Sequence, residues 1–207
     1  VSHPGGNVSI IPYAAAHNIN DYQNNLPVDR APSIGGDGKI AIGPALNLDL
    51  TANPDFSQVE VDQQVTNLSR FEIFYPEKRQ FFLENADLFG SFGYSNMRPF
   101  FSRRIGVTRD PTIGQNIENR IYGGARLSGK LDNNWRIGLM TMQAAENHTI
   151  NLPSINYSVA AIQRKIFTRS NLGLMLINKQ AFHDSSTKDF KMLPNRYNRL
   201  VGVDFNL

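Results

Sequence analysis

The feature that most constrains the fold of this chain is an alternation of apolar and polar residues with a period of two. From Lys39 to Ala52 the even-numbered positions are apolar, whereas the odd-numbered positions are mainly small or polar. Successive side chains of a strand point to opposite faces, so this period indicates β-strands with one apolar face. Similar alternation recurs in the ranges 122–131, 135–139, 171–176 and 201–207, and more weakly in 156–166. The chain is therefore predicted to be all-β.

The connections between these strands alternate in length. Along the chain, short and long connections take turns. Polar turns of about four residues lie at 131–134 and 167–170, and each is followed by a long, proline-containing connection, at 144–155 and 181–195. Transmembrane β-barrels have short periplasmic turns and long external loops, so the pattern predicts an antiparallel transmembrane barrel. A soluble β-sandwich would show the same strand alternation, and it stays open as an alternative. Continued backwards, the alternation makes 109–119 and 18–37 external loops.

The segment from Asn53 to Met97 interrupts this order as an insertion rich in aromatic and charged residues. By the same count it joins the barrel at the periplasmic end, where the short turns lie. So many aromatic rings need a place to be buried, and the barrel lumen offers one. Within the insertion we predict one short helix over Glu77 to Phe89, with Phe81, Phe82, Leu88 and Phe89 roughly aligned on one side.

The same region resembles a known family. The matching runs are Asn53-Pro54-Asp55-Phe56, Pro76-Glu77-Lys78-Arg79, Phe81-Phe82-Leu83-Glu84 and Phe101-Ser102-Arg103-Arg104-Ile105-Gly106. They resemble the barrel domain of Bacteroidetes outer-membrane proteins that carry a carbohydrate-binding-like module of the family nine type before the barrel. Weaker matches extend the resemblance over nearly the whole chain. Gln80 and Asn85 stand where that family usually has a proline and a glycine.

The resemblance implies a porin-like fold in the outer membrane of a Gram-negative bacterium, and it supplies no catalytic residues. It also implies a barrel with many more strands, so residues 1–207 are predicted to be one β-barrel domain or the leading part of one. A complete eight-stranded barrel is the alternative. The insertion argues against it, because the lumen of an eight-stranded barrel is already filled by side chains.

Composition excludes several other classes of protein. The 207 residues include no cysteine, which removes disulfides and thiol chemistry. The net charge of +3 is small and dispersed, so we expect no nucleic-acid partner. The chain has no apolar run of about 18 residues, as a membrane-spanning helix would need. Barrel strands need no such run, because their lipid-facing and lumen-facing residues alternate.

Metal and cofactor sites are not expected. The acidic residues Asp49, Asp55, Glu60 and Asp62 lie close together, but they lack the glycine-turn spacing of a calcium loop. The four histidines are scattered through termini and predicted loops. Phosphate-loop, nucleophile-elbow and zinc-protease motifs are also missing from the sequence.

Glu77 and Glu84 have two interpretations. Two carboxylates at a suitable separation could act as the acid and base of a glycosidase. Arginines and lysines are abundant around them, however, and favour structural ion pairs. Arg126 and Arg136 either line the lumen or pair with carboxylates of the insertion. The predicted plug and lumen contacts are Phe71, Phe74, Glu77, Lys78, Arg79, Phe81, Phe82, Glu84, Arg103, Arg104, Arg126 and Arg136.

The sequence thus predicts a non-enzymatic outer-membrane β-barrel with a role in transport, glycan handling or membrane assembly. Its expected partners are membrane lipid and a glycan or other outer-membrane proteins. A soluble β-rich carbohydrate-binding domain and a carbohydrate-active enzyme are the alternatives. The residues expected to face outward are Ile42, Leu46, Leu48, Leu127, Leu174 and Val203. Those expected in aromatic belts at the level of the lipid headgroups are Tyr13, Tyr122, Trp135 and Tyr157.

Overall fold

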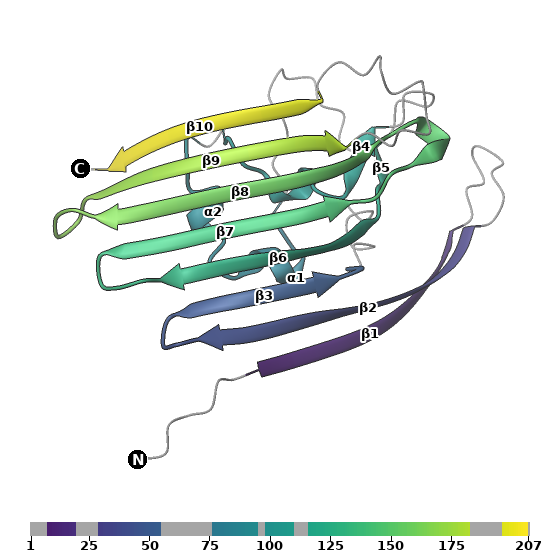
Figure 1. The fold of residues 1–207 in the computed structure, drawn as a ribbon, viewed down its shortest axis with the longest axis horizontal. Coiled ribbons are helices and arrows are strands. Elements are labelled where there is room, and N and C mark those ends of the chain that lie inside the picture. The colour runs from purple at the N-terminus through teal and green to yellow at the C-terminus, as the bar shows by residue number, and fades with distance from the viewer. Residues whose placement is uncertain are drawn as a thin grey trace.

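The fold is one large antiparallel sheet with a chain segment folded over one of its faces (Figure 1). A computed structural model describes residues 8–19, 29–54, 76–94, 98–109, 116–182 and 196–206. Eight strands form the sheet in the order β1-β2-β3-β6-β7-β8-β9-β10. Their bounds are β1 Val8–Ile19, β2 Asp29–Ile42, β3 Leu46–Ala52, β6 Ile121–Lys130, β7 Trp135–Ala144, β8 Ser154–Lys165, β9 Asn171–Phe182 and β10 Tyr197–Asn206. The all-β prediction is confirmed.

The range Lys39 to Ala52 is two strands, not one continuous strand. A turn at residues 43–45 separates β2 from β3, and Gly43 has the positive φ of 67° that such a turn requires. The alternation continues through the turn because Ile42 pairs directly with Leu46. Directly paired residues lie on the same face of a sheet, so both strands keep their even-numbered residues on one side.

Short and long connections lie at opposite ends of the sheet. The turns at 43–45, 131–134 and 166–170 share one end, and strand β10 also finishes there (Figure 1). The segment that links β3 to β6 leaves the sheet at the other end, because Ala52 pairs with Gly123 whereas Leu46 pairs with Gly129 beside a short turn.

The prediction that the insertion joins the end with the short turns is therefore wrong. That prediction needed one more strand between the insertion and residue 109. Residues 107–109 do form a strand, β4 (Val107–Arg109), but it pairs only with β5 (Asn116–Glu118) in a separate two-stranded sheet. Strands β3 and β6 are direct neighbours, and everything between them is one long connection.

The predicted helix over Glu77 to Phe89 is two short helices. They are α1 (Gln80–Leu83) and α2 (Asp87–Gly90), and short 3-10 helices follow at Ser102–Arg104 and His148–Ile150. Asn85, between α1 and α2, has a φ of 48°. Asparagine tolerates this left-handed conformation better than most residues, and it breaks the helix at the position where the resembling family usually has glycine. No helix among the described residues combines the length and the apolar character needed to cross a membrane.

The hydrophobic core lies between this connection and one face of the sheet, which we call the covered face. The connection contributes Phe81, Phe82, Leu88, Phe89, Phe92 and Ile105 to the core. The sheet contributes Ile121, Met140, Met142, Val159, Ala161 and Met175. We call the opposite side of the sheet the outer face.

Candidate functional site

The two faces of the sheet differ in chemistry and in what lies against them. On the covered face, a row of directly paired residues includes Asp49, Arg126 and Met140, and all three are buried. On the outer face, a row of directly paired residues crosses all eight strands and is apolar throughout. Its members are Val8, Ile40, Leu48, Leu127, Leu139, Ala160, Leu176 and Val201.

Exposure separates the faces as clearly. Leu174 is 39% exposed, Val201 70% and Val203 67%, whereas Arg126 on the covered face is 2% exposed. A charged side chain is thus buried while large apolar side chains on the other side of the same strands are bare. In a soluble sheet protein the apolar face is the one that is buried.

Glycines on the covered face make room for two phenylalanine rings. A Cβ atom built on Gly138 of β7 would lie 2.7 Å from the Phe89 ring, and one on Gly173 of β9 would lie 2.7 Å from the Phe92 ring. Real Cβ atoms do not approach other atoms so closely, so both positions require glycine or a shift of the ring. Glycine in a strand interior commonly marks such a close approach.

Arg126 is the central polar anchor between the connection and the sheet. Its guanidinium donates to Asp49 of β3 at 2.8 and 3.2 Å, and to the backbone carbonyl of Glu84 at 2.8 Å. It also lies over the Phe81 ring, 5.2 Å from the centroid. Buried charges are stable only when paired and hydrogen-bonded, and Arg126 meets both conditions.

Glu84, in the turn between α1 and α2, is a second anchor. Its carboxylate accepts a hydrogen bond from Asn47 at 2.6 Å and forms an ion pair with Lys39. The hydrogen bond and charge of Lys39 lower the pKa of Glu84, and they outweigh the opposing effect of burial. The neighbouring Asn85 donates to the Ser128 hydroxyl at 3.1 Å.

Asp87 forms the third anchor at the start of α2. Both of its oxygens accept from Arg136 of β7, at 2.6 and 3.1 Å, and Arg136 also donates to Gln163 at 3.4 Å. The hydrogen bond from Arg136 lowers the pKa of Asp87. The carboxylate is 55% exposed, so solvent screens this pair more than the Asp49–Arg126 pair.

A separate group of contacts holds the connection to itself. Glu77 accepts from Arg79 at 2.8 Å through each of its oxygens, and it also accepts from the Ser102 hydroxyl. Arg79 donates to the carbonyls of Ser102 and Ile105. Burial by itself raises the pKa of Glu77, but the hydrogen bonds and charge of Arg79 outweigh it and lower the pKa. Arg103 donates to the carbonyl of Pro76 at 2.9 Å.

A family model described as a domain of unknown function, DUF5916, matches residues 6–191. The chain belongs to this family. No curated protein and no solved structure matches the chain.

In this DUF5916 domain, the predicted plug and lumen contacts divide into three groups. Phe81, Phe82, Glu84, Arg126 and Arg136 lie where the connection meets the sheet. Glu77, Arg79 and Arg103 hold the connection together internally. The side chains of Lys78 and Arg104 are exposed, and Phe71 and Phe74 lie outside the described residues.

The predicted ion pairing of Glu77 and Glu84 is confirmed, with one correction of partner. Glu77 pairs with Arg79, an arginine of the connection itself, whereas Glu84 pairs with Lys39 of the sheet and not with an arginine. Lys39, Asn47, Asp87 and the two glycines under the phenylalanine rings were not predicted. The polar residues that alternate with leucine along β3 could have indicated the wall contacts of Asn47 and Asp49.

Carboxylate chemistry finds no support in the described residues. Glu77 and Glu84 are both ion-paired, and both have a lowered pKa, whereas a general acid needs a raised one. No group of three or more histidine, aspartate or glutamate residues in the described ranges could hold a metal ion.

The predicted aromatic belts are half wrong. Tyr13 and Tyr157 lie on the covered face: the Tyr13 ring packs against Gly35 and its hydroxyl donates to the carbonyl of Asn53, while Tyr157 packs against the core. The interpretation failed because an aromatic residue near a strand end can point to either face. On the outer face of β10, Tyr197 and Phe205 are 61% and 66% exposed at opposite ends of the strand.

The outer face also has a polar patch at the end with the long connections. The patch consists of Thr141, Gln143, Asn156, Ser158, Asn178, Gln180 and Arg199, all on β7 to β10. Its members bond to one another: Asn156 donates to Thr141 and Gln143, and Arg199 donates to Asn178 at 3.2 Å. The apolar part of the outer face therefore narrows from β1 towards β10.

Proposed function

We propose that this domain is part of a transmembrane β-barrel of the bacterial outer membrane. In this proposal the outer face contacts lipid, and the connection between β3 and β6 lies in the lumen as a plug. One observation carries the proposal: the covered face of the sheet contains buried charged residues among its core residues, whereas the apolar outer face is bare among the described residues. Water is a poor environment for a continuous row of leucine and valine, and lipid is a good one.

The dimensions of the outer face support a membrane span. From Tyr197 to Phe205, β10 has nine residues, and a tilted transmembrane strand needs about 9 to 11 residues to span the apolar core. Membrane barrels have an apolar band about 25 Å tall between two aromatic girdles. The narrowing of the apolar region towards β10 fits strands that cross this band at a tilt, with the polar patch near one membrane surface.

The edges of the sheet support a larger barrel. Strands β1 and β10 each pair on one side only within the described residues, so the sheet is open. Long unpaired edges invite aggregation in water, and they cannot be left unsatisfied in lipid. In the proposal, further strands pair with both edges and close the barrel.

The proposed role is transport, glycan handling or membrane assembly without catalysis. The glycan element depends only on the resemblance to outer-membrane proteins with a carbohydrate-binding-like module. A plug fixed to the sheet by two ion pairs and by the hydrogen bond from Arg126 to the Glu84 carbonyl would restrict the lumen to small solutes. Because the connection leaves the sheet with the long loops, it would enter the lumen from the external side of the membrane.

Adjacent cysteines on opposite faces of β10 test the membrane position. The chain has no native cysteine, so Val203→Cys and Asp204→Cys each give a single label site. In lipid vesicles, the barrel predicts that a charged, membrane-impermeant maleimide labels Asp204→Cys and spares Val203→Cys. A soluble domain predicts the opposite order, because Val203 is 67% exposed to its surroundings. Rapid labelling of Val203→Cys in vesicles would refute the proposal.

Charge reversal tests the plug. Glu84→Lys combined with Asp87→Lys places cations against Lys39, Arg126 and Arg136 and should release the connection from the wall. The expected result is a higher single-channel conductance in planar bilayers. Lys78→Glu is the control, since Lys78 is exposed and lies in the same segment. Unchanged conductance in a correctly folded double variant would refute the plug.

A further inference from the structure

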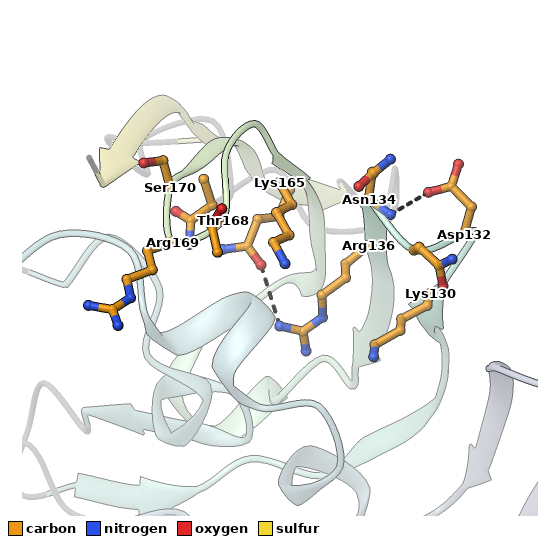
Figure 2. Close-up of a pocket in the computed structure, with 11 residues that line it drawn as sticks. Lys130, Asp132, Asn134, Arg136, Lys165, Thr168, Arg169 and Ser170 are labelled. Atoms are coloured by element: carbon orange, nitrogen blue, oxygen red, sulfur yellow. Dashed lines mark hydrogen bonds between the residues drawn. The ribbon is translucent and has the colours of Figure 1, made fainter.

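An open basic pocket lies next to Arg136, at the end of the sheet with the short turns. It has a volume of about 550 Å³ and lies between the turns at 131–134 and 166–170. Lys130, Arg136, Lys165 and Arg169 all line it, and Asp132 is the one carboxylate in its lining. Figure 2 shows Lys130, Arg136 and Lys165 extending from neighbouring strands towards the same space, whereas Arg169 extends away to the side.

The strand register explains this convergence. Lys130 pairs directly with Arg136, Arg136 with Gln163, and Lys165 with Asn171, so these side chains share the covered face at the ends of their strands. Like charges placed so close together repel one another. The sequence concentrates cations here although the net charge of the whole chain is only +3.

Of the four cations, Arg136 alone has an ion pair among the described residues. Asp132 accepts hydrogen bonds from the backbone N–H groups of Asn134 and Trp135, which orients its carboxylate towards its own turn. Asp87 is paired with Arg136 beside α2. No ion pair joins Lys130, Lys165 or Arg169 to any carboxylate in the described ranges. An anion from solution can therefore take the place of the missing counter-ion.

We propose that this pocket binds a small solute through a phosphate or sulfate group. Lys130 and Lys165 supply point charges, and the side chains of Asn134, Thr168 and Asn171 add neutral hydrogen-bond donors to the lining. The volume lies within the range of about 300 to 1,000 Å³ that is usual for small-molecule sites. The inference does not depend on the proposed membrane position, because the site belongs to the turns and strand ends themselves.

Calorimetric titration of the complete 207-residue chain tests the site. The probes are inorganic pyrophosphate, glucose 6-phosphate and, as a neutral reference, glucose. Binding of both phosphate compounds but not glucose is expected, and stronger binding of one of them identifies free or sugar-linked phosphate as the better ligand. Lys130→Gln combined with Lys165→Gln should weaken binding by roughly tenfold or more. Losing a hydrogen bond to a charged group commonly lowers the affinity by about that factor.

The matched control is Arg164→Gln. Arg164→Gln removes one positive charge next to Lys165, but Arg164 lies on the outer face, 5.1 Å from the Trp135 ring centroid. The proposal expects unchanged phosphate affinity in this variant. It is overturned if neither phosphate compound binds the unmodified chain, if Arg164→Gln weakens binding as much as the double variant, or if glucose binds as tightly as the phosphate compounds.

Discussion

The two faces of the sheet are made by the same strands, yet they follow opposite rules. The covered face contains the buried Asp49–Arg126 ion pair and phenylalanine rings that rest over glycines. The outer face contains leucine, isoleucine and valine without a covering layer in the described residues. Alternation along a strand guarantees two different faces, but it does not determine which of them is covered.

The difference shows that the specific contacts of this sheet lie on its covered face. Specific contacts, namely three anchors and two ring-on-glycine contacts, fix one position of the connection on the covered face. In the proposed barrel the outer face needs no such specificity, since lipid adapts to any apolar surface. The two faces should therefore respond differently to the same type of substitution.

The largest effect is expected at the central anchor. Arg126→Met leaves the Asp49 carboxylate buried without a counter-ion and removes the donor to the Glu84 carbonyl. Breaking a buried ion pair costs about 3 to 5 kcal/mol. Urea unfolding can be followed through the fluorescence of Trp135, which is the single tryptophan. Adding Asp49→Leu removes the stranded charge, so the double variant should be more stable than Arg126→Met alone; an equal loss in both would show that the pair is not an anchor.

A comparison within the outer face comes next. In lipid vesicles, Leu174→Arg should lower the free energy of unfolding by about 2 to 4 kcal/mol, as a cation does at the bilayer midplane. Ser158→Arg lies in the polar patch, which the proposal places near one membrane surface, and it should cost no more than about 1 kcal/mol. Denaturant titration in vesicles measures both. Equal effects at the two positions would contradict the proposal that Leu174 lies near the bilayer midplane and Ser158 near a membrane surface.

Much of the fold could be predicted from the sequence, because the alternation of apolar and polar residues is a local property of each strand. Alternation located β9, β10 and the leucines of the outer face. It missed the turn at 43–45. Because Ile42 pairs directly with Leu46, the even-numbered residues lie on the same face before and after the turn, and the alternation shows no break. The position of the insertion depended on counting every strand, so one extra strand moved its attachment to the wrong end.

The candidate site was less predictable for a different reason. Buried aromatics such as Phe81 and Phe82 were recognisable from their density in the sequence. The choice of partner was not, because Asp49 and Arg126 are 77 positions apart and meet only when β3 pairs with β6. Gly138 and Gly173 resemble ordinary strand glycines until the rings above them are known.

These glycines provide the third test, which again concerns the covered face. Gly138→Ala and Gly173→Ala force a methyl group against Phe89 and Phe92, and overpacking of this kind costs about 1 to 3 kcal/mol. Gly202→Ala is the control, because its Cβ would meet only ordinary contact at 3.7 Å. Its effect should stay within about 0.5 kcal/mol. Urea midpoints that are the same for all three variants would show that the rings do not depend on glycine.

The smallest effect is expected from acid, and it separates the anchors from one another. Glu84 and Asp87 have a lowered pKa when the connection is docked, so releasing the connection takes up protons. Their contribution to stability is complete above the ordinary pKa values of 4.5 and 3.8, and it is lost as the pH falls through the lower values of the docked state. Both groups are partly exposed, so each contributes no more than about 1 kcal/mol.

Hydrogen exchange of the amides from Phe81 to Phe92, measured between pH 6 and pH 3 and corrected for intrinsic rates, should show loss of protection over this window. In the variant with Glu84→Gln and Asp87→Asn the pH dependence should flatten; if it persists unchanged, groups other than these two anchors control the docking of the connection.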